Sequence, residues 1–398
     1  MAPTKPLRQG EFVALMAALF ATIAISIDAM LPALPQIAAT LTPDAPNRAQ
    51  LVVTSFVFGM GLGTLFAGPL ADAFGRKAVI LAGALVYVLA AIACYFSQSL
   101  EALLIARVVQ GIGASAPRVV TTAMIRDLFH GRDMARVMSL VMTVFTLVPA
   151  VAPLMGQGVI AIADWHAIFL VYVAFAAVII LWMALRLPET MPADKRRPLS
   201  ISALWLATKE LFGHRIVTLS ILAQTLTLAS LFSLLSSQQG IFEQRFDRAE
   251  TFPTWFGIIA LVSISGSIFN ARMVMRLGMR RVLIGAYTGA VAITVALLAL
   301  IWSGVMPEPL AFPAHVLWSI VMFAMMGLSL GNLNALAMEP VGHIAGLAAS
   351  VIASISTVLS VLIAIPVGLA FDGTVVPLMA GVAVFITLAL VIVRQSAR

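Results

Sequence analysis

The chain has 398 residues, of which 61% are hydrophobic and only 10% are charged. A soluble domain carries about 25% charged residues, so this composition excludes an ordinary soluble protein and indicates an integral membrane protein. The formal net charge of +7 is also typical of nucleic-acid-binding proteins, so the position of each basic residue matters.

Long apolar stretches follow one another along the chain. A hydrocarbon core about 30 Å thick requires about 20 apolar residues per helix, and twelve stretches meet this requirement. They are too long for membrane β-strands and lack the alternation of such strands. We therefore predict an all-α integral membrane fold with twelve transmembrane helices. The predicted helices span 12–36, 50–72, 78–96, 101–124, 137–160, 166–187, 216–240, 253–275, 281–303, 312–337, 344–370 and 375–393.

The basic residues fall almost entirely on one side of the membrane when the N-terminus is placed inside. Of the 24 Lys and Arg residues, only five lie elsewhere: Arg48, Arg245 and Arg248 outside, and Arg107 and Arg118 within the fourth helix. This asymmetry follows the positive-inside rule. It predicts that both termini are cytoplasmic, and it explains the net charge without a nucleic-acid partner.

The longest polar interval, 188–215, separates six predicted helices from six others. We predict an N-terminal six-helix bundle over 1–187, a cytoplasmic linker over 188–215 and a C-terminal six-helix bundle over 216–398. Within the linker, residues 201–212 are predicted to form a short helix on the cytoplasmic surface.

The first predicted helix contains an ionisable residue, Asp28, within the sequence SIDAMLPALPQIA. Asp28 lies about 16 residues, or roughly 24 Å, into the helix. Burial there disfavours a charged carboxylate, and intramembrane carboxylates usually mark ion or substrate paths. Asp28 is therefore a candidate proton site. The alternative is that it marks the outer end of the helix and is solvated, since Pro32 and Pro35 follow.

The fourth predicted helix carries two arginines. Arg107 lies at a depth similar to that of Asp28, so an ion pair would lower the cost of burying both charges, and proton uptake by Asp28 would release Arg107. A purely structural ion pair is the alternative. Arg118 follows about three turns later on nearly the same face. It is predicted either to line the substrate cavity or to extend toward the cytoplasmic edge.

Two segments combine small residues with charges or prolines. In the fifth predicted helix, LVPAVAPLMGQGVI, prolines bend the helix and glycines allow close packing. In GPLADAFGRK, between the second and third helices, positive-inside bias alone would explain Arg76 and Lys77. The joint spacing of this basic pair with two glycines and one aspartate favours a specific role. The residues concerned are Gly68, Asp72, Gly75, Arg76 and Lys77 in the loop, and Pro149, Pro153, Gly156 and Gly158 in the helix.

Five amide side chains are candidates for the substrate cavity, because amides seldom lie in lipid without a partner. They belong to the seventh and tenth predicted helices and are Gln224, Gln238, Gln239, Asn332 and Asn334.

Enzyme motifs do not support catalysis. The chain lacks the Gly-x-x-x-x-Gly-Lys-Ser/Thr loop and the His-Glu-x-x-His metal motif. One Gly-x-Ser-x-Gly match, at 327–331, lies inside an apolar helix without the strand-to-helix turn that exposes a nucleophile. We expect no catalytic residue, no cofactor and no bound metal.

Taken in order, SIDAMLPALP, GPLADAFGRK, ARVVQG, APLMGQG and DWHAIF resemble motifs of the major facilitator superfamily (MFS). Within it they resemble the drug:proton antiporter branch of the chloramphenicol and bicyclomycin resistance type. The resemblance implies an MFS fold of two six-helix bundles, a cytoplasmic latch at 68–77, a role of Arg107 in proton coupling and an antiporter signature in the fifth helix. That helix departs from the family form Gly-Pro-x-x-Gly-Gly.

The function that the resemblance implies is proton-coupled efflux of small, amphipathic, drug-like molecules by alternating access. The alternative is an MFS exporter or importer of one specific metabolite. The expected partners are a small-molecule substrate, protons and the lipid bilayer. The expected form and location are a monomer in the bacterial inner (cytoplasmic) membrane.

Overall fold

A computed structural model of the protein describes residues 7–396, in which long α-helices dominate. Twelve of these helices have at least 20 residues, the length that a membrane crossing requires. They are α1 (Gln9–Asp28), α3 (Leu51–Phe74), α4 (Arg76–Tyr95), α5 (Leu100–Leu128), α6 (Gly131–Ile162), α7 (Ala167–Arg186), α9 (Arg215–Gly240), α10 (Phe252–Leu277), α11 (Met279–Trp302), α12 (Glu308–Met338), α13 (Ala345–Leu369) and α14 (Val376–Ser396). The two shorter ones are α2 (Leu34–Leu41) and α8 (Ile201–Gly213).

One helical stretch, Glu308–Leu369, has 62 residues and supplies two crossings. A straight helix of that length would extend about 90 Å, three times the thickness of a hydrocarbon core. The stretch instead turns at a 3₁₀ segment, Glu339–Ile344, where Val341 leaves helical geometry with φ −122° and ψ 27°. The described residues therefore contain the twelve predicted crossings, and the chain is a multi-pass membrane protein.

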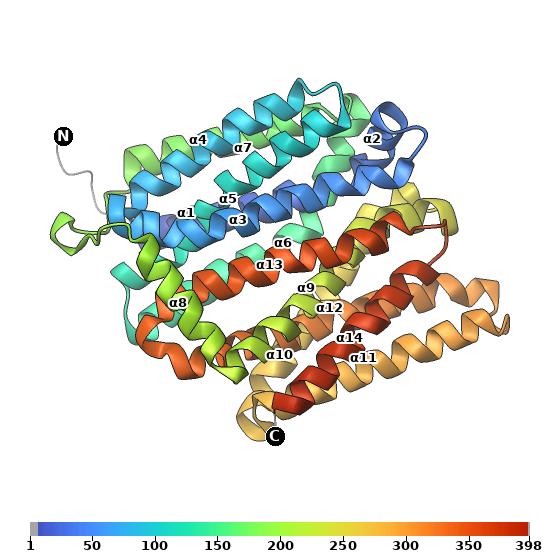
Figure 1. Cartoon of the computed structure of the whole chain (residues 1–398). Helices are drawn as coiled ribbons and strands as arrows, with labels where there is room; N and C mark the ends of the chain where they lie inside the picture. The colour runs from blue at the N-terminus through green and yellow to red at the C-terminus, as the bar shows by residue number, and fades with distance from the viewer. Residues whose placement is uncertain (1–6, 397–398) are drawn as a thin grey trace.

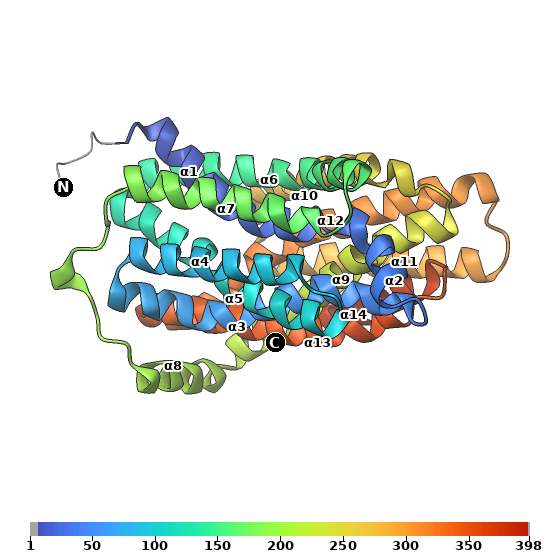
Figure 2. The same cartoon turned by 90° about the horizontal axis from the view of Figure 1, so that it is seen from above.

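The long helices form two groups. In Figure 1, α1 and α3–α7 lie together on one side, and α9–α14 lie together on the other. Residues 187–200 pass from the first group to the second around one end of the molecule, and α8 lies beside the long helices there (Figure 2). We call this the linker end, and the opposite end, which carries α2, the far end. The short surface helix predicted over 201–212 is confirmed as α8.

The two groups are joined at the far end. The side-chain amide of Asn47 donates to the backbone oxygens of Leu369 (3.0 Å) and Phe371 (2.6 Å). The amide of Gln157 donates to the backbone oxygen of Glu250 at 2.8 Å. One apolar cluster buries aromatic side chains of both groups: Phe56, Trp165, Phe169, Phe232, Phe242, Phe252 and Phe256. The far end is therefore closed.

Close packing of α5 against α3 depends on glycine. A Cβ atom at Gly111 would overlap the backbone oxygen of Phe56, and one at Gly59 would overlap the backbone oxygen of Val108. Helices in lipid associate largely through such close contacts, because lipid tails are as apolar as the side chains they would replace. These two glycines thus set the distance between α3 and α5.

We expect Gly111→Ala to lower the midpoint of thermal unfolding in detergent. Alanine normally stabilises a helix interior by about 1 kcal/mol relative to glycine, but overpacking at this contact costs about 1–3 kcal/mol. Gly285→Ala is the matched control, because a Cβ atom there has nothing within 4 Å. The control should leave the midpoint unchanged or raise it. Equal midpoints for the two variants would contradict the role of Gly111 in packing.

Candidate functional site

A cavity of about 390 Å³ lies between the two helix groups at the linker end. Its walls come from α1, α3, α4 and α5 of the first group and from α9, α12 and α13 of the second. Three of the residues predicted to line a substrate cavity do line it, namely Arg118, Gln224 and Asn334. Asp72, in the last turn of α3, and Arg76, the first residue of α4, line it as well, because the predicted loop is helical except at Gly75. The molecule is therefore open at the linker end and closed at the far end.

The guanidinium of Arg118 lies in the cavity wall without a carboxylate. Its Nη1 lies 3.8 Å from the sulfur of Met60, a weak acceptor. Within residues 7–396 it forms no ion pair. Gln224 lines the same cavity, and its buried side-chain oxygen also lacks a hydrogen-bond partner among the described residues. A ligand that accepts from Arg118 and donates to Gln224 would satisfy both groups.

The other three predicted amides lie outside this cavity in this conformation. Gln238, near the end of α9, donates to the hydroxyl of Ser319 at 2.9 Å. Asn332 turns toward α10 and donates to the side-chain oxygen of Asn270 at 2.8 Å. Gln239 is buried and lines a smaller cavity at the far end. The sequence indicates how deep each residue lies, whereas its neighbours are set by helix packing.

The loop at the linker end is organised around Arg76, whose side chain is buried. Its Nη1 donates to Asp72 at 2.5 Å, and its Nε donates to Asp127, at the end of α5, at 3.0 Å. Charge-assisted bonds of this kind are about twice as strong as neutral ones, so Arg76 joins the ends of α3, α4 and α5. Gly68 allows close approach of α13, because a Cβ atom there would lie 3.0 Å from the hydroxyl of Ser350.

Glu189 is a further partner of this loop. Its carboxylate accepts from the backbone N–H groups of Arg76 (2.9 Å) and Lys77 (3.1 Å). These groups begin α4, where free N–H donors and the helix dipole favour a negative charge. Gly75 makes the preceding turn with φ +101°, and a Cβ atom there would collide with the same carboxylate. The ammonium of Lys77 donates to the backbone oxygen of Ala184 at 2.8 Å.

Sequence reasoning missed both Asp127 and Glu189. Each is an acidic residue within three residues of the end of a predicted helix, on the side with most of the basic residues. That position is the signal that would have identified them as partners of the loop.

Arg107 is fully buried, and its donors are directed at neutral oxygens. Its Nε donates to the backbone oxygen of Val52 (3.1 Å), its Nη1 to the side chain of Gln110 (2.7 Å) and its Nη2 to the backbone oxygen of Ser26 (3.0 Å). The guanidinium also lies over the ring of Phe56, 4.4 Å from its centroid. These contacts connect α5 to α3 and α1.

Asp28 is the last residue of α1 and is only 5% exposed. Within the described residues it forms no ion pair. The expected Asp28–Arg107 pair is therefore not formed in this conformation. The guanidinium donates its hydrogen bonds to backbone and amide oxygens instead. Arg107 nevertheless binds Ser26, two residues before Asp28. The similar depth of the two residues was predicted correctly, but not the acceptors of Arg107.

The glycines of α6 differ in their contacts. A Cβ atom at Gly156 would overlap the backbone oxygen of Ala29, directly after Asp28, whereas one at Gly158 would have nothing within 4 Å. On another part of α6, Ala150 faces Gly257 of α10. Helix α6, which contains Pro149 and Pro153 of the predicted antiporter signature, thus lies between the end of α1 and the second helix group.

Comparisons with known proteins agree with this architecture. Residues 14–365 match the profile of the Major Facilitator Superfamily. An uncharacterised MFS-type transporter of Bacillus subtilis, YdgK, is 31% identical over 371 residues, which are 91% of this chain and 89% of the relative. A bicyclomycin resistance protein homolog of Haemophilus influenzae is 32% identical over 263 residues, 63% of each chain. The multidrug resistance protein MdtL of Citrobacter koseri is 33% identical over 258 residues, 63% of this chain and 65% of the relative.

Solved transporter structures share the fold. The D-xylose–proton symporter superposes with a TM-score of 0.76 at 13% identity, over 96% of this chain and 97% of the other. The nucleoside transporter NupG superposes with a TM-score of 0.73 at 15% identity, over 98% and 99% of the two chains. The sequence match, the relative that spans most of the chain and the twelve-helix fold lead to one conclusion: the chain belongs to the Major Facilitator Superfamily and is a transporter, not an enzyme.

Proposed function

We propose that the protein is a proton-coupled antiporter that exports small, amphipathic, drug-like molecules across the bacterial inner membrane. Two relatives are named for resistance to bicyclomycin and to multiple drugs. The observation that carries the proposal is the cavity that is open at the linker end while the far end is closed. The basic residues concentrate at the linker end, so under the positive-inside rule this end and both termini face the cytoplasm. The cavity is then loaded from the cytoplasm.

Alternating access requires the two helix groups to move against each other as bundles, residues 1–187 and 216–398, joined by the linker 188–215. Across the boundary, α3 packs against α13 and α6 packs against α10. We assign the pivot to these two helix pairs. We assign a monomer as the transporting unit, because both helix groups that enclose the cavity belong to the same chain.

Substrate recognition is assigned to Arg118 and the two cavity amides, Gln224 and Asn334. Arg118 forms no ion pair among the described residues and lines a cavity of mixed polar and apolar residues, so it favours molecules that carry an acceptor oxygen or a negative charge on an apolar body. Such molecules are amphipathic.

Proton coupling is assigned to Asp28. A buried carboxylate without a counter-charge is costly, so Asp28 carries a proton while Arg107 is bound to backbone oxygens. When the proton leaves toward the cytoplasm, the carboxylate competes with Ser26 and Val52 for the guanidinium. The hydrogen bonds that connect α5 to α1 and α3 then weaken, and the helices of the first group rearrange.

The latch function is assigned to Asp72. Asp72 lines the cavity together with Gly346 and Leu347, in the first turn of α13. When the cytoplasmic end closes, the carboxylate approaches the free N–H groups of that turn, where negative charge is stabilised by about 0.3–1 kcal/mol. Arg76 and Asp127 hold Asp72 in place for this contact.

Asp28→Asn should abolish proton-driven efflux, because asparagine cannot exchange a proton. We expect at least a tenfold loss of dye or drug efflux in sealed vesicles with an imposed proton gradient. Asp44→Asn, which changes an exposed carboxylate of the same half, should transport normally. Undiminished proton-driven efflux by Asp28→Asn would remove Asp28 from the mechanism.

Dye accumulation in intact cells distinguishes export from import. Cells that express the protein should accumulate less dye, and accumulation should rise when a protonophore removes the gradient. Accumulation that increases with expression would favour the alternative, an importer of a specific metabolite.

Arg118→Gln should raise the KM for an anionic dye about tenfold and leave that for a cationic dye nearly unchanged. The reason is the loss of one charge-assisted hydrogen bond, worth about 1.5–3 kcal/mol. Arg215→Gln, at an exposed position of α9 outside the cavity, is the control. Equal effects of Arg118→Gln on both dyes would contradict the assignment.

Asp72→Ala should lower the turnover number more than it raises KM, because the latch stabilises one conformation and does not contact substrate. Asp133→Ala, an exposed carboxylate in the first turn of α6, is the matched control. Steady-state transport kinetics in vesicles provide the test. Unchanged turnover with weakened binding would show that Asp72 belongs to the substrate site instead.

A further inference from the structure

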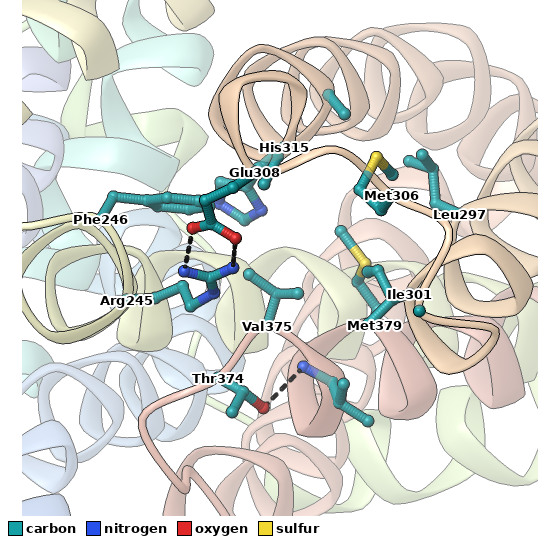
Figure 3. A pocket seen from close by; sticks show the side chains of 14 residues that line it. Arg245, Phe246, Leu297, Ile301, Met306, Glu308, His315, Thr374, Val375 and Met379 are labelled. Atoms are coloured by element: carbon teal, nitrogen blue, oxygen red, sulfur yellow. Dashed lines mark hydrogen bonds and ion pairs between the residues drawn. The ribbon is translucent and has the colours of Figure 1, made fainter.

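A second cavity, of about 260 Å³, lies inside the second helix group at the far end. Figure 3 shows it between the end of α9, the end of α11 and the beginnings of α12 and α14. Its lining shares no residue with the cavity at the linker end. Apolar side chains form most of the wall, among them Leu297, Ile301, Met306 and Met379.

The charged groups of this far-end pocket are already paired. Arg245 donates two hydrogen bonds to Glu308, at 2.7 Å and 2.9 Å (Figure 3). This bidentate pair joins the end of the π-helical segment Ile241–Arg245 to the first turn of α12. A charged ligand would have to compete with it. The pocket therefore favours a neutral ligand.

One polar group in the wall lacks a partner. His315 is 1% exposed, and its Nε2 lies 3.0 Å from the side-chain oxygen of Gln238. The amide nitrogen of Gln238 donates to Ser319, so its oxygen is the acceptor and Nε2 of His315 is the donor. In a neutral imidazole the other nitrogen, Nδ1, is then an acceptor. Nδ1 is buried and has no hydrogen-bond partner among the described residues.

Aromatic neighbours restrict the orientation of this imidazole. The rings of Phe242, Phe246 and Trp318 lie 6.2 Å, 5.5 Å and 5.7 Å from it, measured between centroids. A buried acceptor without a donor costs free energy. Because the ring is both enclosed and bonded to Gln238, it cannot turn freely to find a donor elsewhere in the protein. His315 lines the pocket, so a molecule bound there is positioned to supply the missing donor.

We propose that the far-end pocket binds a small, neutral, largely apolar molecule that carries one hydroxyl or N–H donor, in the class of phenols and indoles. The donor bonds to Nδ1 of His315, and the ring of the ligand packs against the apolar wall formed by Leu297, Ile301, Met306 and Met379. Thioether sulfur makes favourable contacts with aromatic rings. The volume lies below the roughly 300 Å³ at which pockets for drug-sized ligands begin, which restricts the ligand to one or two rings. The inference does not depend on the direction of transport.

The test compares two ligands of nearly equal shape on the full-length protein in detergent. By ¹⁹F NMR, 4-fluorophenol should bind at least ten times more tightly than 4-fluoroanisole, which has no donor. Equal affinities, or no binding of either, would overturn the proposal and assign the partner of Nδ1 to water. Empty detergent micelles give the partition background that is subtracted from both titrations.

Two pairs of variants locate the binding. Met306→Trp fills the pocket from its rim and should abolish phenol binding, whereas Met275→Trp, at a position that is 87% exposed on α10, should not. His315→Asn retains an acceptor near the position of Nδ1 and should bind phenol, whereas His315→Phe should lose the preference for phenol over anisole. Phenol binding that survives Met306→Trp would place the ligand elsewhere and overturn the proposal, even if the His315 variants fail to fold.

Discussion

The hydrogen bonds of Arg107 determine how the first helices of the chain meet. At membrane depth each of its N–H groups needs an acceptor from the protein, because lipid offers none. Backbone oxygens of Ser26 and Val52 supply two of these acceptors, and both come from other helices. The glycine contacts between α3 and α5 bring Val52 within reach. Movement of α1 or α3 leaves a buried cation unsatisfied, so this cluster favours discrete arrangements over gradual displacement.

Some of the polar groups that lack partners within residues 7–396 line cavities that a mobile species can enter. Arg118 and Gln224 line the cavity at the linker end, and His315 lines the far-end pocket. Asp28 is buried beside the Arg107 cluster and forms no ion pair among the described residues. An unsatisfied polar group in a membrane protein costs several kcal/mol. A stable fold tolerates that cost where a substrate, a ligand or a proton supplies the missing partner, so these groups point to function more directly than the satisfied ones.

Much of the fold was predictable because the membrane imposes length and apolarity on each crossing. The twelve crossings follow from that constraint alone. The direction in which a side chain faces around its helix is harder to predict, because its neighbours depend on which helices pack together. The position of Arg107 along its helix therefore indicated that it lies near the end of α1, but it did not indicate which oxygens accept its hydrogen bonds. In the same way the sequence did not indicate that Asn332 faces α10, or that Asp127 and Glu189 complete the loop around Arg76.

The two halves repeat a geometry without repeating its chemistry. The turn between the second and third long helices of each half contains a glycine with positive φ, +101° at Gly75 and +80° at Gly278. Asp72, three residues before the first glycine, is bonded to Arg76, whereas Met275, three residues before the second, is 87% exposed. The turn is needed in both halves because each must reverse the chain tightly at the membrane surface. The charges of the first half, Asp72 and Arg76, are those that join the ends of α3, α4 and α5.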